Sequence, residues 1–287
     1  MRLCSFNVKN LFVAGDAGIA QSHYGARPKR QAEIRALARA LNRVEADLVA
    51  FQEVGSLAAL NSVNQLVSDP YPYLSVVPGN SRRGIHLGFA SRLPMTLTSH
   101  ADRSLLDVDQ QVIEDYPDAA SAKIGATCSL GLQRDLLRCD LQIDGCQLSV
   151  FNLHLKSPNQ PGWSRLRADE LRQAESRLIA RIVTESQQHD EQTAIVMLGD
   201  FNDLWPSAAL LPLDEAGLIQ VGFAPAADNL RSFWPRAITI DHILVNVVAA
   251  QWLVPDSAMI HDAKSFRRGS DHCPVSVDLQ VQVSSAL

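Results

Sequence analysis

The chain has 287 residues, 46% of them hydrophobic and 20% charged, with a formal net charge of −5. This composition excludes collagen-like and intrinsically disordered proteins, and no apolar run reaches the length of a membrane span. The N-terminal residues lack the pattern of a signal peptide, so we expect a cytoplasmic protein. Five cysteines without a C-x-x-C pair argue against a disulfide framework and a zinc site.

The first half of the chain predicts strands and helices in alternation. After a first strand, apolar residues recur at helical spacing from Pro28 onward and predict an amphipathic helix. The run DLVAFQEV then predicts a buried strand that ends near Glu53. Apolar spacing over 57–67 predicts a second helix, and strand-like pieces occupy 73–99. The acidic stretch at about 101–131 has no clear period and is expected to be a surface loop.

The second half contains the clearest local pattern, a β-hairpin whose turn is Asp144 and Gly145. Asn152 and His154 continue the inner face of this hairpin. A long helix follows, with apolar residues from Leu171 to Ile182 on one face and several arginines elsewhere. The runs AIVMLGDFND, ITIDHILVN, VAAQWLV and PVSVDLQVQV predict strands. No repeat or linker divides the chain, so we expect one α/β domain over residues 1–287.

Several apolar strands end in polar groups that suit a hard cation or proton transfer. These groups are Asn7, Glu53, His154, Asp200 with Asn202, Asp241, and Asp271 with His272. They would converge if the strand ends share one rim of the fold, and carboxylate and amide oxygens suit Mg²⁺ or Mn²⁺ rather than zinc. One acidic residue at a strand end is usually a turn or capping residue, but its repetition favours a metal-dependent site.

The fragments that carry these residues are FQEV, NLHLKS, LGDFND, TIDHILV and GSDHCPV, in that order. Together they resemble the endonuclease/exonuclease/phosphatase superfamily, which has the magnesium-dependent fold of pancreatic deoxyribonuclease. The resemblance runs from SFNVKNLF to SDHCPVSVDL and so covers nearly the whole chain. It implies a four-layer α/β sandwich, in which two packed mixed β-sheets are flanked by helices and the site lies at one end.

The resemblance implies a metal site and a general base. Glu53 would ligate the Mg²⁺ or Mn²⁺ ion directly, assisted by Asn7 and Asp271. His272 would accept a proton from the attacking water, because imidazole titrates nearest neutral pH. Asp241 would fix the tautomer of His272 and stabilise the imidazolium.

The resemblance implies further roles around the phosphate. Asp200 and Asn202 would position the water, the phosphate or a second metal ion. His154 would donate a hydrogen bond to a non-bridging oxygen as charge develops. Arg134 and Lys156 are candidates for binding a substrate phosphate, although either could instead brace its strand.

The leading hypothesis is a Mg²⁺-dependent phosphodiesterase that cleaves DNA or RNA, supported by arginine-bearing segments near both long helices. Trp163, Trp205 and Trp234 lie near the motifs and could stack on bases, although one of them could equally insert into lipid or cap the core. The alternative is hydrolysis of a lipid headgroup or a small phosphorylated metabolite, as in sphingomyelinases or inositol phosphatases, which would use the same residues. A non-catalytic scaffold is disfavoured because every expected catalytic position is filled.

Two features of the sequence limit the kinds of nucleic acid that we expect a nuclease of this type to prefer. His154 stands where abasic-site endonucleases usually have tyrosine, which argues against dedicated incision at abasic sites. The negative net charge and the acidic stretch over 102–118 argue against tight, unspecific binding of duplex DNA.

Overall fold

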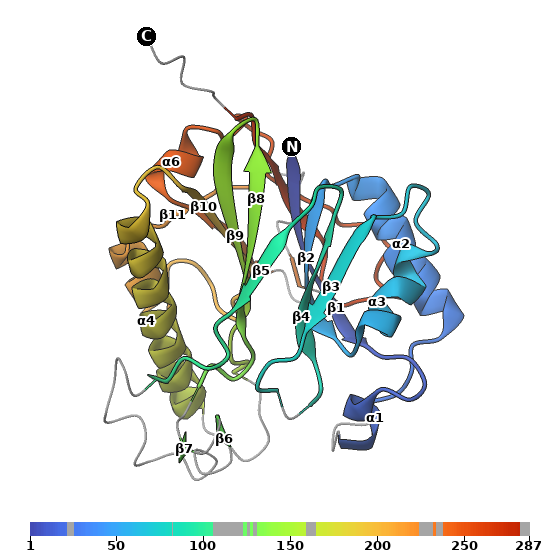
Figure 1. The fold of residues 1–287 in the computed structure, drawn as a ribbon. Coiled ribbons are helices and arrows are strands. Elements are labelled where there is room, and N and C mark those ends of the chain that lie inside the picture. The colour runs from blue at the N-terminus through green and yellow to red at the C-terminus, as the bar shows by residue number, and fades with distance from the viewer. Residues whose placement is uncertain are drawn as a thin grey trace.

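The structure is a computed structural model that describes residues 1–21, 26–81, 83–105, 123–124, 127–128, 131–158, 165–223, 232–233 and 238–281. Within these ranges, two six-stranded sheets pack against each other (Figure 1). In spatial order, the first sheet consists of β13 (Met259–Ile260), β14 (Val275–Asp278), β1 (Arg2–Leu11), β2 (Leu48–Val54), β4 (His86–Ser91) and β3 (Tyr73–Val77). The second sheet consists of β11 (Ile219–Gln220), β12 (Asp241–Val245), β10 (Ala194–Asp200), β9 (Cys146–His154), β8 (Leu136–Ile143) and β5 (Thr96–Ser99).

Both sheets are mixed, because β1 runs parallel to β2 and β9 runs parallel to β10, whereas their other pairings are antiparallel. A separate pair is formed by β6 (Lys123–Ile124) and β7 (Thr127–Cys128). The helices are α1 (Ala17–Gln21), α2 (Gln31–Val44), α3 (Leu57–Asn64), α4 (Arg165–His189), α5 (Leu211–Glu215) and α6 (Val247–Ala250).

Helices cover the outer faces of the two sheets (Figure 1). Helices α2 and α3 lie on the first sheet, and the long helix α4 lies on the second. The apolar positions that repeat with helical spacing in α2, from Ile34 to Val44, are buried against that sheet. The α4 positions Leu171 and Ile182 are likewise buried. This arrangement confirms the expected four-layer α/β sandwich.

The β8–β9 hairpin has the predicted register. Cys139 pairs with Val150 and Ile143 pairs with Cys146, so the turn lies at Asp144 and Gly145. Asp144 and Gly145 both have φ in the left-handed region, at 50° and 83°. Asp tolerates this conformation and Gly adopts it freely, which explains why this dipeptide forms the turn.

One predicted strand is wrong. The run VAAQWLV was expected to be extended, but Val247–Ala250 forms the short helix α6. The cause is Asn246, whose Oδ1 accepts hydrogen bonds from Ala249 N at 2.9 Å and Ile195 N at 3.0 Å, while its Nδ2 donates to Thr193 O at 3.0 Å. Asn246 is therefore an N-cap residue that also ties the helix to β10.

The acidic stretch that was expected to form a surface loop is described only in part, because residues 106–122, which contain most of it, lie outside the described residues. None of the helices in the described ranges is long and apolar enough to cross a membrane.

We predict that Asn246→Ala lowers the free energy of unfolding by about 3 kcal/mol, because it removes a helix cap and leaves buried main-chain groups without partners. Chemical denaturation measures this change. The control is Gln251→Ala at the exposed opposite end of α6, which should stay within about 0.5 kcal/mol of the wild type. Equal effects of the two substitutions would contradict the capping role.

Candidate active site

The inner faces of the two sheets change from apolar to polar along their strands. In β9, Leu148 and Val150 belong to the core between the sheets, and the alternation of side chains then places Asn152 and His154 on the same face. Registers align the strand ends: Asp200 of β10 is paired with both His154 and Asp241 on the neighbouring strands. Three candidate residues from three strands therefore lie side by side at the rim of the second sheet.

The first sheet contributes the facing side chains in the same way. Asn7 of β1 is paired with Gln52 of β2, and both are buried. Gln52 Nε2 donates to Asn152 Oδ1 of the opposite sheet at 2.8 Å. Asn7 Nδ2 donates to Asp200 Oδ2 at 2.9 Å. These two bonds join the sheets across the buried base of the site.

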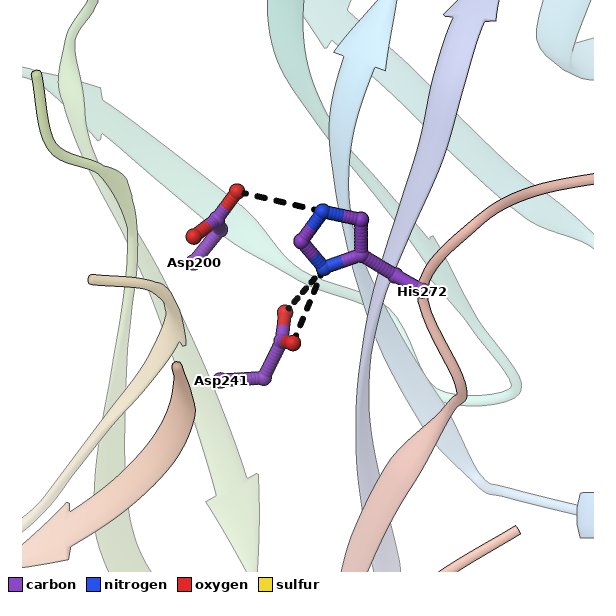
Figure 2. A group of neighbouring side chains, drawn as sticks. All are labelled: Asp200, Asp241 and His272. Carbon is purple, nitrogen blue, oxygen red and sulfur yellow. Dashed lines mark hydrogen bonds and ion pairs between the residues drawn. The ribbon is translucent and has the colours of Figure 1, made fainter. Parts of the chain in front are cut away.

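His272 and Asp241 form a buried pair (Figure 2). His272 Nδ1 lies 2.9 Å from Asp241 Oδ2, and its Nε2 lies 3.6 Å from Asp200 Oδ2. Ser232 Oγ accepts a hydrogen bond from Asp241 N, and Ser270 Oγ accepts one from His272 N. The bond at Nδ1 fixes the orientation of the ring, so Nε2 is the nitrogen that faces Asp200 and the cleft.

The charges around His272 favour its protonated form. Burial opposes the imidazolium, but the negative charges of Asp241 and Asp200 outweigh burial and raise the pKa of His272 to about 10. Burial raises the pKa of Asp200 itself to about 7. A general base at neutral pH needs the neutral imidazole, so this role requires a positive charge that offsets Asp200.

Asp200 is the centre of the arrangement. Its carboxylate, 2% exposed, accepts hydrogen bonds from Asn7 Nδ2 and from Asn202 N, each at 2.9 Å. His154 Nε2 lies 3.4 Å from Asp200 Oδ2 and 4.0 Å from Glu53 Oε1. Desolvation of the buried ring, helped by nearby Arg134, lowers the pKa of His154 well below its usual value. A neutral ring whose Nε2 faces two carboxylates favours the Nε2–H tautomer.

The backbone is irregular where the side chains enter the site. Seven non-glycine residues in the described ranges have φ in the left-handed region, and Lys9, Asn10, Glu53 and Asn202 are four of them. The pairing of β1 with β2 shifts register after Asn7, and that of β2 with β4 shifts between Phe51 and Val54. Such strained residues concentrate at functional sites because they re-aim side chains.

Several of these residues line a cleft with a volume of about 240 Å³, whereas Asn7 and Asp241 are not among its lining residues. Fifteen residues line the cleft. They are Lys9, Asn10, Glu53, Arg83, Arg134, His154, Ser157, Pro158, Asp200, Asn202, Phe233, Ile238, Ile240, Asp271 and His272.

The remaining candidates are placed differently. Asp271 lines the cleft but accepts a 2.6 Å hydrogen bond from Lys9 Nζ in an exposed ion pair. Arg134 is buried at the cleft and donates from Nη1 to Leu155 O. Lys156 is also buried but is not among the residues that line the cleft. The structure thus places Arg134, and not Lys156, among the residues that line the cleft.

Eight lining residues were not singled out from the sequence, and four of them carry charged, amide or aromatic side chains: Lys9, Asn10, Arg83 and Phe233. Asn10 donates its main-chain N–H to Glu53 Oε2 at 2.9 Å, and Arg83 Nη2 donates to Asn10 Oδ1 at 2.8 Å. The ring of Phe233 lies 5.0 Å from that of His272. Only Lys9 and Asn10 carried a usable signal, because they lie within the strand-end fragment SFNVKNLF.

The donor set fits a hard divalent cation. Asp200, Asp241 and His272 offer ligand atoms that all lie within 4.8 Å of one another. His272 and Asp241 already bond to each other, however, and Mg²⁺ prefers oxygen ligands. The carboxylates of Asp200 and Glu53, both directed at His154 Nε2, are therefore the groups that could hold such an ion.

A buried ionic network on α4 fixes the loops that carry the site. Glu175 accepts hydrogen bonds from Gln133 N at 2.8 Å and Lys156 N at 2.9 Å. Arg172 is one of the arginines of this helix that were expected away from its apolar face, but it is 2% exposed and donates to Lys156 O and to Asp203 Oδ2. The network thus holds the segments next to Arg134, His154 and Asn202.

A family model described as "Endonuclease/Exonuclease/phosphatase family" matches residues 4–272. The chain belongs to this family. The match confirms the resemblance noted from the strand-end fragments. Members of the family are metal-dependent hydrolases of phosphoester bonds, and the chain is therefore an enzyme of this type. A search of curated protein sequences finds no match.

Solved structures of low sequence identity share the fold of this family. The human nocturnin catalytic domain with bound sulfate has a TM-score of 0.64 and 17% identity, covering 98% of this chain and 94% of that one. Beta toxin from Staphylococcus aureus has a TM-score of 0.62 and 14% identity, covering 98% and 100%. The mannosyl-6-phosphatase of Bacteroides thetaiotaomicron has a TM-score of 0.59 and 15% identity, covering 98% and 100%.

We predict that Glu175→Gln lowers kcat for a phosphodiester about 10-fold with little change in KM, because the amide can accept only one of the two main-chain hydrogen bonds and the site shifts. Steady-state kinetics at a temperature well below the midpoint of thermal unfolding test this change in kcat. Hydrogen exchange at the main-chain amides of Gln133 and Lys156 should become faster in the variant.

The control is Glu170→Gln on the exposed face of the same helix, which should change neither quantity. An unchanged kcat in Glu175→Gln, with exchange at both amides as slow as in the wild type, would contradict the positioning role.

Proposed function

We propose that the chain is a divalent-metal-dependent phosphodiesterase that cleaves nucleic acid, with residues 1–287 acting as one catalytic domain. The observation that carries this proposal is the orientation of His272. Asp241 holds its Nδ1, and its Nε2 faces Asp200 in a cleft that is also lined by basic side chains. A phosphodiester placed there would meet a proton-transfer group, carboxylates for a cation and positive charge at once.

The cleft residues have distinct parts in this mechanism. His272, oriented by Asp241, would accept the proton of the attacking water at Nε2. Asn202, whose main-chain N–H holds Asp200 Oδ1, would help to position that water. His154 would donate its Nε2–H to a non-bridging phosphate oxygen.

Glu53 and Asp200 would hold Mg²⁺ or Mn²⁺, with Asn7 orienting Asp200 through its 2.9 Å hydrogen bond and Asp271 as a further oxygen donor at the rim. When bound, the ion supplies positive charge to the phosphate oxygens and lowers the pKa of a bound water. Burial of the Asp200 carboxylate supports this assignment, because a buried charge needs a partner of opposite sign.

The surroundings of the cleft favour nucleic acid as the substrate. Lys9, Arg83 and Arg134 supply positive charge, and Phe233 supplies a half-buried aromatic ring. Cations beside an aromatic ring are the combination that binds single-stranded nucleic acid through its phosphates and bases.

The tryptophans near the motifs and the arginines of α4 give less support to a nucleic acid substrate than the sequence indicated. Trp205 packs near His242 at a ring distance of 6.4 Å and against the core under α4, and Trp163 and Trp234 lie outside the described residues. On α4, Arg172 is buried and Arg181 is paired with Glu185. The support for a nuclease therefore rests on the residues of the cleft itself.

We predict that His272→Ala lowers kcat about 10²- to 10⁴-fold while the fold survives, because the change removes the proton acceptor and little core packing. Asp241→Asn should also be impaired, since an amide can favour the wrong tautomer of His272. Hydrolysis of bis(p-nitrophenyl) phosphate measures kcat, and circular dichroism shows whether the fold survives. His189→Ala at the exposed end of α4 is the control. Near-normal turnover of His272→Ala would refute the assigned role.

We predict that chelation abolishes hydrolysis and that Mg²⁺ or Mn²⁺ restores it, because the oxygen donors fit a hard cation. A panel of single-stranded DNA, duplex DNA with and without an abasic site, RNA, sphingomyelin and inositol phosphates tests the substrate. Salt-sensitive cleavage of nucleic acid without preference for the abasic site is the expected result. Activity that resists chelation would refute the metal site, and hydrolysis of only lipid or small phosphoesters would replace the nuclease proposal.

A further inference from the structure

A second cavity adjoins the catalytic cleft. Its volume is about 460 Å³, and Lys9, Asn10, Phe233 and Asp271 line both this cavity and the cleft. The rest of its wall comes from the segment before α2, from α2 itself and from the loop before His272. A substrate long enough to extend beyond the cleft would therefore reach the residues of this cavity.

The second cavity is rich in positive charge. Five basic residues line it, against two acidic residues, Glu33 and Asp271. The basic residues are Lys9, Arg27, Lys29, Arg267 and Arg268. The whole chain carries a net charge of −5, so the charge of the residues that line this cavity is opposite in sign to the net charge of the protein. A surface of this kind attracts an anion and steers it toward the adjoining cleft.

The basic residues are held to different degrees. Arg27 donates through both terminal nitrogens to Glu33, and Arg267 donates to Asp262. Lys29 Nζ donates to Gly269 O at 2.6 Å, and desolvation lowers the pKa of Lys29 to about 8. Arg268 is exposed, and among the described residues the structure gives its guanidinium no hydrogen bond or ion pair. The donors of Arg268 thus remain available to a ligand.

We propose that this cavity binds the phosphate that flanks the scissile phosphate in a nucleic acid strand, with Arg268 as its main contact. The inference rests on the proposed function. Guanidinium donates two parallel hydrogen bonds to phosphate oxygens, and Lys29 and Arg267 add positive charge around the same cavity. Phe233, which lines both cavities, is placed at their junction, where a base could stack on its ring.

Binding of a fluorescein-labelled single-stranded oligodeoxynucleotide in the presence of chelator tests the proposal without turnover. Arg268→Gln should raise Kd about 10-fold, since it removes a charge-assisted contact. The slope of log K against log salt should fall by about 0.7, as expected for one lost phosphate contact on a single strand. The matched control is Arg35→Gln, an exposed arginine of α2 that does not line the cavity; it should leave Kd and slope unchanged.

A substrate comparison separates this site from the proposed function. Arg268→Gln should lower kcat/KM about 10-fold for the oligonucleotide. It should leave hydrolysis of bis(p-nitrophenyl) phosphate unchanged, because that diester has no flanking phosphate. Equal losses on both substrates, or equal effects of Arg268→Gln and Arg35→Gln on Kd, would overturn the flanking-phosphate site. A wild type that hydrolyses only the small diester and does not bind the oligonucleotide would overturn the nuclease proposal and this site together.

Discussion

The buried carboxylate of Asp200 is the charge on which the arrangement of the site depends. A carboxylate that is 2% exposed would be costly without partners, and the structure supplies an amide from Asn7, a main-chain N–H from Asn202 and two imidazoles at 3.4 and 3.6 Å. Apart from Asn202, these partners come from segments far from Asp200 in the sequence. The two sheets must therefore pack correctly before the charge is compensated, which links the integrity of the sandwich directly to the chemistry at its rim.

The rest of the fold keeps this charged rim in place. The core between the sheets is apolar along most of each strand, and its buried polar side chains include Gln52 and Asn152 next to the site. On the outer side of the second sheet, Glu175 and Arg172 of α4 bind the main chain of the loops that carry the site. Buried polar networks of this kind are stabilising only when every member is satisfied, so they also define a single geometry for the loops.

Much of this could be predicted from the sequence, because strands have a period of two and their polar ends are visible as fragments. That period placed His154 on the inner face, and the register then brought it beside Asp200. Contacts between distant segments could not be predicted in this way. Helix α6 depends on bonds from Asn246 to β10, and the burial of Arg172 depends on Asp203 and the main chain of Lys156. Arg83 and Phe233 lie in irregular segments that carry no periodic signal.

The Mg²⁺-dependent shift of the thermal unfolding midpoint tests the proposal that Asp200 and Glu53 hold a divalent cation. An ion that binds only the folded protein stabilises it in proportion to the logarithm of the ion concentration above Kd. We expect a clear rise of the midpoint for the wild type and for the exposed control Asp214→Asn, and loss of this rise in Asp200→Asn and Glu53→Gln. A shift in Asp200→Asn as large as in the wild type would contradict the proposal.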